Sequence, residues 1–152
     1  MTDMITMQVI RYALEQIADE MGHTLVRTGR STIITEIKDI SCVVTDTTGQ
    51  AIAQAHHTPS LLAGFEITMR ELVKTYRPED LEPGDVIVTN DPYRGCQHIM
   101  DLYAIAPAFH AGELVGFVGN ITHHADLGGV AAGGVGRDVG LLAIYFVPIF
   151  IA

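Results

Sequence analysis

The segment LYAIAPAFHAGELVGFVGNI, residues 102–121, decides which fold this sequence can adopt. Its two apolar runs, 102–109 and 114–121, flank an Ala-Gly pair at 111–112, and a glycine-containing connection between two such runs is typical of a β-hairpin. Both runs are apolar on both faces, which predicts that the hairpin is buried within a larger sheet. Pro107 cannot donate a ladder hydrogen bond, so we expect it at a sheet edge or a β-bulge.

Side chains that can bind a metal ion stand at both ends of this hairpin. His98 and Asp101 precede it, and His123, His124 and Asp126 follow it. A turn centred on 111–112 places Asp101 opposite residue 122 and His98 opposite residue 125. Directly paired residues lie about 5 Å apart and diagonal ones about 7–8 Å. The spacing therefore predicts that His98, Asp101, His123 and Asp126 converge on one ion.

Imidazole and carboxylate ligands suit zinc, iron(II), manganese or nickel, and a set that needs no thiolate favours an open catalytic site. Cys96, two residues before His98, is either a soft ligand, a reactive thiol or a buried inert cysteine. The candidate histidines and aspartates can instead have structural roles. Asp126, for example, precedes a Leu-Gly-Gly segment and can stabilise a turn. We interpret the remaining histidines as structural or exposed: His23, His56, His57 and His110.

Helical and extended segments surround the hairpin. Apolar residues recur every three or four positions from Asp3 to about Arg27, which predicts an amphipathic helix capped by Thr2 or Asp3. A second such stripe covers 61–76 and ends before a proline. Three shorter segments are expected to be strands: 41–46, 50–55 and 86–89. The expected fold class is α+β, with amphipathic helices packed on antiparallel strands and a metal-bearing β-hairpin.

Composition limits the classes of function. The chain has 152 residues and a formal charge of −9, which fits one domain and argues against nucleic-acid binding. Two cysteines and a start without a signal-peptide pattern favour the cytoplasm. The uncharged segment GLLAIYFVPIFIA, residues 140–152, is shorter than the roughly twenty residues that span a bilayer, so we expect no membrane insertion. We expect a partner to bury this segment, or the chain to be the front part of something larger.

Two motifs carry a resemblance to a known family. P-G-D-V-x-x-x-N-D-P-Y-x-G-x-x-H-x-x-D covers residues 83–101, and H-H-A-D-L-G-G covers 123–129. Both resemble the hydantoinase B/oxoprolinase family, as do segments upstream of them, in order, from about residue 5. This family includes the B subunit of N-methylhydantoinase, part of 5-oxoprolinase and the alpha subunit of acetone carboxylase. The resemblance divides the chain into a family-like region at 1–138 and a hydrophobic tail at 139–152 that departs from the pattern.

The resemblance implies a metal-binding component of an ATP-coupled amidohydrolase. A hydantoinase A-like ATP-binding subunit would activate a small cyclic amide or imide, so ATP is expected on that partner and the assembly is a hetero-oligomer. The metal ligands implied are His98, Asp101 and His123, with manganese in the acetone carboxylase branch and zinc or iron as alternatives. Further ligands or orienting residues would be His124, Asp126 and Cys96, and the motif loop contributes Asn90, Asp91 and Tyr93.

Two other functions stay open, and no catalytic residue is assigned. One is a subunit of a related ATP-dependent ketone carboxylase; the other is a non-catalytic truncated or assembly module. The family usually carries Gly-Gly-Thr before the motif histidine, whereas this chain has Gly95-Cys96-Gln97, and a bulkier loop there can change the metal or the substrate. Family members are several times longer, so we expect this chain to match about their N-terminal quarter as part of a larger family fold.

Overall fold

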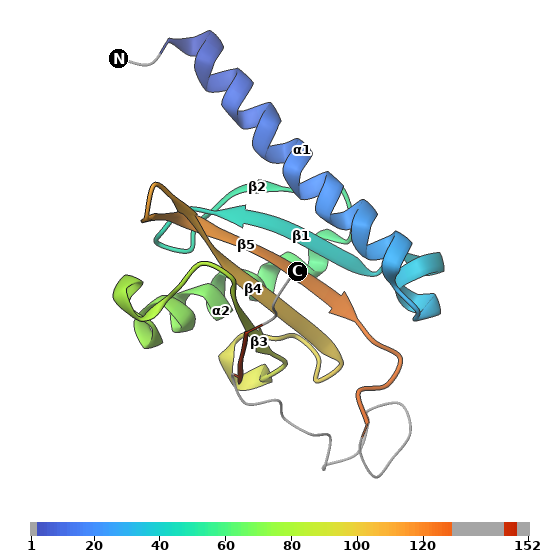
Figure 1. Ribbon diagram of the computed structural model, residues 1–152. Coiled ribbons are helices and arrows are strands. Elements are labelled where there is room, and N and C mark those ends of the chain that lie inside the picture. Colours follow the sequence, from blue (N-terminus) through green and yellow to red (C-terminus); the bar gives the residue numbers. More distant parts are fainter. Residues whose placement is uncertain (1–2, 129–144, 149–152) are drawn as a thin grey trace.

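A six-stranded antiparallel sheet organises the molecule, and two helices pack on its opposite faces (Figure 1). The computed structural model describes residues 3–128 and 145–148. The strand order is β2-β1-β5-β4-β3-β6, and every neighbouring pair is antiparallel. The strands are β1 Ile40–Thr45, β2 Ala51–Gln54, β3 Asp85–Thr89, β4 Asp101–His110, β5 Glu113–His123 and β6 Tyr145–Pro148. The expected α+β class is confirmed.

The predicted hairpin is β4–β5, and it lies in the middle of the sheet. Its register is correct at the tip, where His110 pairs with Glu113, but a bulge beside Ala108 shifts every later pair by one residue. The placement of Asp101 opposite residue 122 is therefore wrong: Asp101 pairs directly with His123. The physical reason is the extra residue that a bulge inserts into one strand. Pro107 lies next to this bulge, as its missing N–H predicts.

Helix α1, Met4–Thr28, confirms the first predicted helix, and the Asp3 carboxylate caps it by accepting a hydrogen bond from the Thr6 N–H. Its buried residues lie in the C-terminal half, where Ala18 packs against β1 and β2 and Gly22 packs against His57. Its N-terminal half extends past the strands in Figure 1, so the apolar side chains there face solvent. They are Met4, Ile5, Met7, Val9, Ile10 and Tyr12, all at least 50 % exposed.

Helix α2, Leu62–Thr75, covers the opposite face and forms the main core. Phe65, Met69 and Leu72 are almost fully buried, and they contact odd-numbered β4 and β5 residues because side chains alternate between the faces of a strand. Phe65 stacks on Tyr103, with ring centroids 6.0 Å apart and planes inclined by 10°. The Cys96 side chain belongs to the same cluster.

Short helical turns connect these elements: a π-helix at Ile33–Ile37 and 3-10 turns at Pro59–Leu61, Pro78–Asp80 and Pro92–Arg94. Within the hydrophobic tail, β6 pairs with β3, an element that the sequence pattern did not predict. The rest of the tail and most of the glycine-rich segment lie outside the described residues. Among the described helices, none is long and apolar enough to cross a membrane.

The core position of Phe65 generates a stability prediction. Phe65→Ala leaves a cavity against Tyr103 and is expected to lower the free energy of unfolding by about 3–5 kcal/mol. The matched control is Ile67→Ala on the same helix, which removes a side chain that is 51 % exposed and should cost less than about 0.5 kcal/mol. Urea denaturation measures both values, and equal losses would contradict this assignment of the core.

Candidate metal centre

The Asp101 carboxylate is the centre of the site, and it is completely buried. Asp101 is the first residue of β4, and its backbone N–H donates to the His98 carbonyl oxygen over 3.0 Å. In return, Asp101 Oδ2 accepts the His98 backbone N–H and faces His98 Nδ1, each over 2.9 Å. The H-x-x-D spacing therefore forms a tight local turn that aims the imidazole at the carboxylate.

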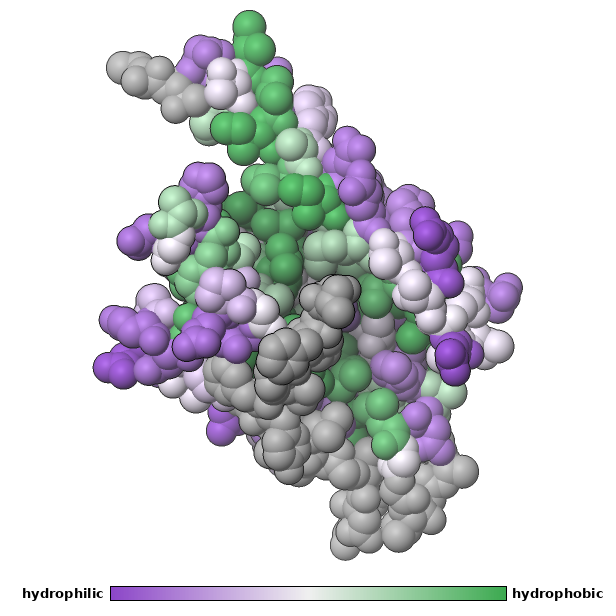
Figure 2. All heavy atoms as spheres, in the orientation of Figure 1, coloured by the Kyte–Doolittle hydropathy of each residue, from purple (hydrophilic) through white to green (hydrophobic). Residues whose placement is uncertain are grey.

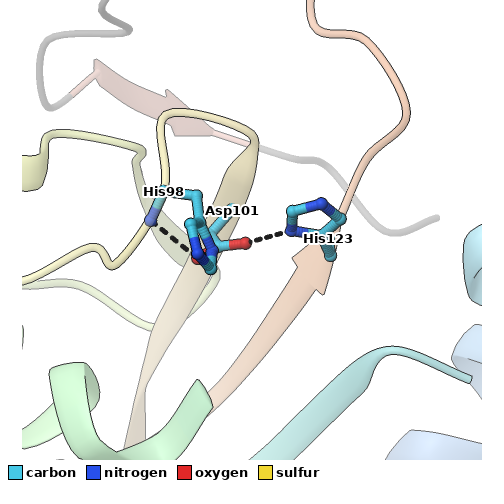
Figure 3. A group of neighbouring side chains, drawn as sticks. All are labelled: His98, Asp101 and His123. Carbon is cyan, nitrogen blue, oxygen red and sulfur yellow. Dashed lines mark hydrogen bonds and ion pairs between the residues drawn. The ribbon is translucent and has the colours of Figure 1, made fainter. Parts of the chain in front are cut away.

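His123 reaches the same carboxylate from the neighbouring strand. It is the last residue of β5, directly paired with Asp101, and its Nδ1 lies 2.6 Å from Asp101 Oδ1 (Figure 3). Its backbone N–H donates to the Asp39 carbonyl oxygen just before β1, over 3.1 Å. His123 is thus held between two neighbouring strands, with only 18 % of its side chain exposed.

One ligand atom from each of these three residues lies within 4.8 Å of the other two. The two imidazole rings stand nearly perpendicular, at 89°, with centroids 5.4 Å apart. A buried carboxylate needs a positive counter-charge, because an unpaired charge away from water is costly. Neutral imidazole nitrogens and a carboxylate oxygen are ordinary ligands of divalent first-row metals. The donor set and the burial of Asp101 therefore fit a divalent cation, and the 60 % exposure of His98 leaves one side open.

The structure does not bring His124 or Asp126 into this group. His124 Nε2 lies 2.9 Å from Thr122 Oγ1, and burial lowers the pKa of His124, with a smaller contribution from His123. Asp126 is exposed and accepts the Gly128 N–H over 2.8 Å, which is the turn-stabilising role that its sequence context allows. The expected convergence of Asp126 differs from the structure because β5 ends at His123 and the chain leaves the sheet there.

Cys96 is a core residue. It is 3 % exposed, and its Sγ lies 3.8 Å from the Thr89 carbonyl oxygen. Burial raises the pKa of the Cys96 thiol to about 12, so a thiolate ligand or nucleophile is disfavoured near neutral pH. Of the three interpretations, the buried inert cysteine is the one that fits this environment.

The motif loop is held in shape by hydrogen bonds between side chains and backbone. Asn90 is fully buried and its Nδ2 donates to the Ile99 carbonyl oxygen over 2.9 Å, which ties the two ends of the loop together. Asp91 caps the short helical turn Pro92–Arg94 by accepting the Tyr93 N–H. The Tyr93 side chain is 92 % exposed.

The other histidines have the structural or exposed roles expected. His110 is exposed at the tip of the hairpin. His57 packs so closely on α1 that a Cβ at Gly22 would lie 2.1 Å from its Nε2. Sequence reasoning missed the contact between Asp39 and His123, because no local pattern shows that β1 pairs with β5.

The His–Asp–His group at the open end of the central hairpin of this antiparallel α+β domain makes the chain a candidate metal-binding domain. Within the described residues, His98, Asp101 and His123 are the potential metal ligands that form a group of at least three with donor atoms within 4.8 Å of one another. Comparison with known proteins then gives the family. The hydantoinase B/oxoprolinase model matches residues 3–140, and the chain belongs to that family.

Known proteins share both the sequence and the fold. A protein of Pseudomonas sp. strain NS671, named as the putative B subunit of a D-/L-hydantoinase, is 37 % identical over 88 % of this chain and 23 % of its own length. The ATP-dependent caprolactamase of Pseudomonas jessenii has a TM-score of 0.84 at 29 % identity, over 95 % of this chain and 26 % of that chain. A nucleotide-free acetone carboxylase structure has a TM-score of 0.77 at 19 % identity, over 88 % of this chain and 19 % of that chain, which shows the shared fold.

This is a family of enzymes that includes oxoprolinases and hydantoinases. The chain spans between a tenth and a quarter of the length of the curated relatives that it matches.

Proposed function

We propose that this chain is the metal-binding component of an ATP-coupled enzyme that hydrolyses a small cyclic amide or imide. The observation that carries the proposal is the buried Asp101 carboxylate between the imidazoles of His98 and His123. Family membership supports it, and the names hydantoinase and caprolactamase both describe enzymes that act on cyclic amides.

The residues that would hold the ion are His98, Asp101 and His123. A bound divalent ion, whether manganese, zinc or iron, would polarise a carbonyl oxygen or lower the pKa of a water molecule. The Asp101 carboxylate holds both Nδ1 atoms beside it before an ion binds, and its burial keeps it from swinging towards solvent. The exposed side of His98 is the direction from which a small substrate can approach.

ATP-dependent activation of the amide would be the task of a hydantoinase A-like subunit. The relative from Pseudomonas sp. is named as one subunit of a hydantoinase, which supports a hetero-oligomer in which ATP binds to a partner. Both cysteines are free and buried, which fits a reducing compartment, and we propose the cytoplasm. A ketone carboxylase subunit is the alternative reaction within the same family, and assays with a lactam and with a ketone plus bicarbonate distinguish the two.

Metal content tests the proposed site. Protein purified without added metal is expected to hold about one equivalent of a first-row metal by elemental mass spectrometry. Each of His98→Ala, Asp101→Ala and His123→Ala removes one donor and should weaken metal binding at least about tenfold. His110→Ala, an exposed histidine at the far end of the same hairpin, is the matched control and should keep the parent's content. Full metal content in the three variants would refute the site.

The second candidate function is an assembly module, and the exposed apolar half of α1 favours it. Figure 2 shows hydrophobic residues gathered at that end of the helix and on the neighbouring sheet surface. Exposed apolar patches of this kind mark interaction surfaces. In the hydantoinase relative from Pseudomonas sp., about three-quarters of the polypeptide lies outside the matched region, and we propose that equivalent polypeptide as what covers this face.

Light scattering coupled to size exclusion distinguishes this candidate. The isolated chain is expected to self-associate, because the residues that the structure describes leave the apolar side chains of the N-terminal half of α1 exposed. Ile5→Lys combined with Val9→Lys, two exposed positions on α1, should shift it to a monomer with an unchanged melting temperature. A parent chain that is monomeric and turns over substrate alone would count against the assembly role.

A further inference from the structure

Together, His98, Asp101 and His123 are called the metal group below. The imidazole of His98 is its most exposed member, and few packing contacts hold it. Its side chain is 60 % exposed, and both its backbone N–H and its ring Nδ1 are directed at Asp101 Oδ2. A side chain at the surface takes its position mainly from the backbone that carries it. The position of His98 therefore depends on what holds the loop between β3 and β4.

Two glycines bring this loop into direct contact with α2. A Cβ added at Gly64, in the first turn of α2, would lie 2.1 Å from the Gly95 carbonyl oxygen and 2.9 Å from Tyr103 Oη. A Cβ added at Gly95 would lie 2.6 Å from Thr68 Oγ1 and 2.8 Å from the Gly64 carbonyl oxygen. A side chain on either glycine would therefore clash with the opposite segment, and the absence of both side chains lets the loop lie directly against the helix.

The residues after Gly95 extend this contact up to the metal group. Cys96 inserts into the core on the α2 face. Gln97 Nε2 donates to the Ser60 carbonyl oxygen, over 2.5 Å, in the turn that precedes α2. Three consecutive residues are thus anchored immediately before His98. Gly95 also has a φ of +112°, a left-handed conformation that glycine adopts without strain and that sets the direction in which the loop leaves the contact.

We propose that Gly64 is a positioning residue for the metal ligand His98. Because its hydrogen atom leaves room for the Gly95 carbonyl oxygen, the loop can approach α2 closely enough to bring the His98 imidazole to Asp101. This inference rests on the proposed metal-binding function. It assigns to a helix residue, which contacts neither metal ligand nor substrate, control over the geometry of the site.

Gly64→Ala tests the proposal directly. The added methyl group is expected to push the loop away from α2 and weaken Co²⁺ binding about 10–100-fold, measured by calorimetric titration. The visible absorption spectrum of bound Co²⁺ should also change, because one imidazole is displaced. A purely structural role would lower the melting temperature through the same clash but leave the Co²⁺ affinity and spectrum of the folded protein unchanged.

Gly116→Ala is the matched control. A Cβ at Gly116 would lie 2.2 Å from the Thr45 carbonyl oxygen, a clash of the same severity, but this residue lies next to the hairpin bulge at the opposite end of β5 from His123. It should lower the melting temperature while Co²⁺ affinity and spectrum stay those of the parent. If Gly64→Ala fails to fold, Gln97→Ala tests the positioning of the loop instead, because it removes only the exposed hydrogen bond to the Ser60 carbonyl oxygen. We expect this variant to lose Co²⁺ affinity several-fold.

The outcomes separate this inference from the proposed function. A parent protein that binds no Co²⁺ refutes the metal function itself. A parent that binds Co²⁺ through His98, together with a folded Gly64→Ala variant of equal affinity and unchanged spectrum, refutes only the positioning role. Parental affinity in Gln97→Ala, where Gly64→Ala does not fold, refutes it as well.

Discussion

The Asp101 carboxylate accepts hydrogen bonds from two imidazoles that arrive from opposite sides, one from a tight turn before β4 and one from the end of β5. This shared acceptor is fully buried, so the free-energy cost of its charge depends on both partners staying in place. Direct pairing of Asp101 with His123 requires the one-residue shift that the bulge introduces further along the hairpin. With the unshifted register, successive side chains point to opposite faces, and His123 would lie on the wrong face of the sheet.

The two faces of the sheet differ in how completely a helix covers them, and the His98–Asp101–His123 group lies beside the more completely covered face. On the α2 face, Phe65 and Tyr103 pack tightly and hold the central strands, while the loop before β4 lies on the same helix. The group formed by His98, Asp101 and His123 therefore lies at the rim of the well-packed side. On the α1 face, the buried contacts of the helix lie in its C-terminal half, and its N-terminal half exposes apolar side chains.

Much of this was predictable from the sequence because it depends on local patterns. Helical spacing identified α1 and α2 to within a few residues, and the apolar runs around residues 111–112 identified the central hairpin. The hairpin prediction placed His98, Asp101 and His123 at the same end of the two strands, but the one-residue shift at the bulge is what puts Asp101 and His123 on the same face. Contacts between distant segments account for what the patterns missed. A bulge beside Ala108 leaves no clear sequence signal apart from the nearby Pro107, and the periodicity of α1 cannot show where the underlying sheet ends. The contact between Gly64 and Gly95 joins segments that no local pattern connects.

A crystal structure of the metal-loaded protein, with anomalous difference density collected at the absorption edge of the bound metal, tests the central claim most directly. We expect one peak about 2.0–2.3 Å from donor atoms of His98, Asp101 and His123. A peak held by other residues, such as His56 and His57, or the absence of density between these three side chains in protein that contains stoichiometric metal, would contradict it.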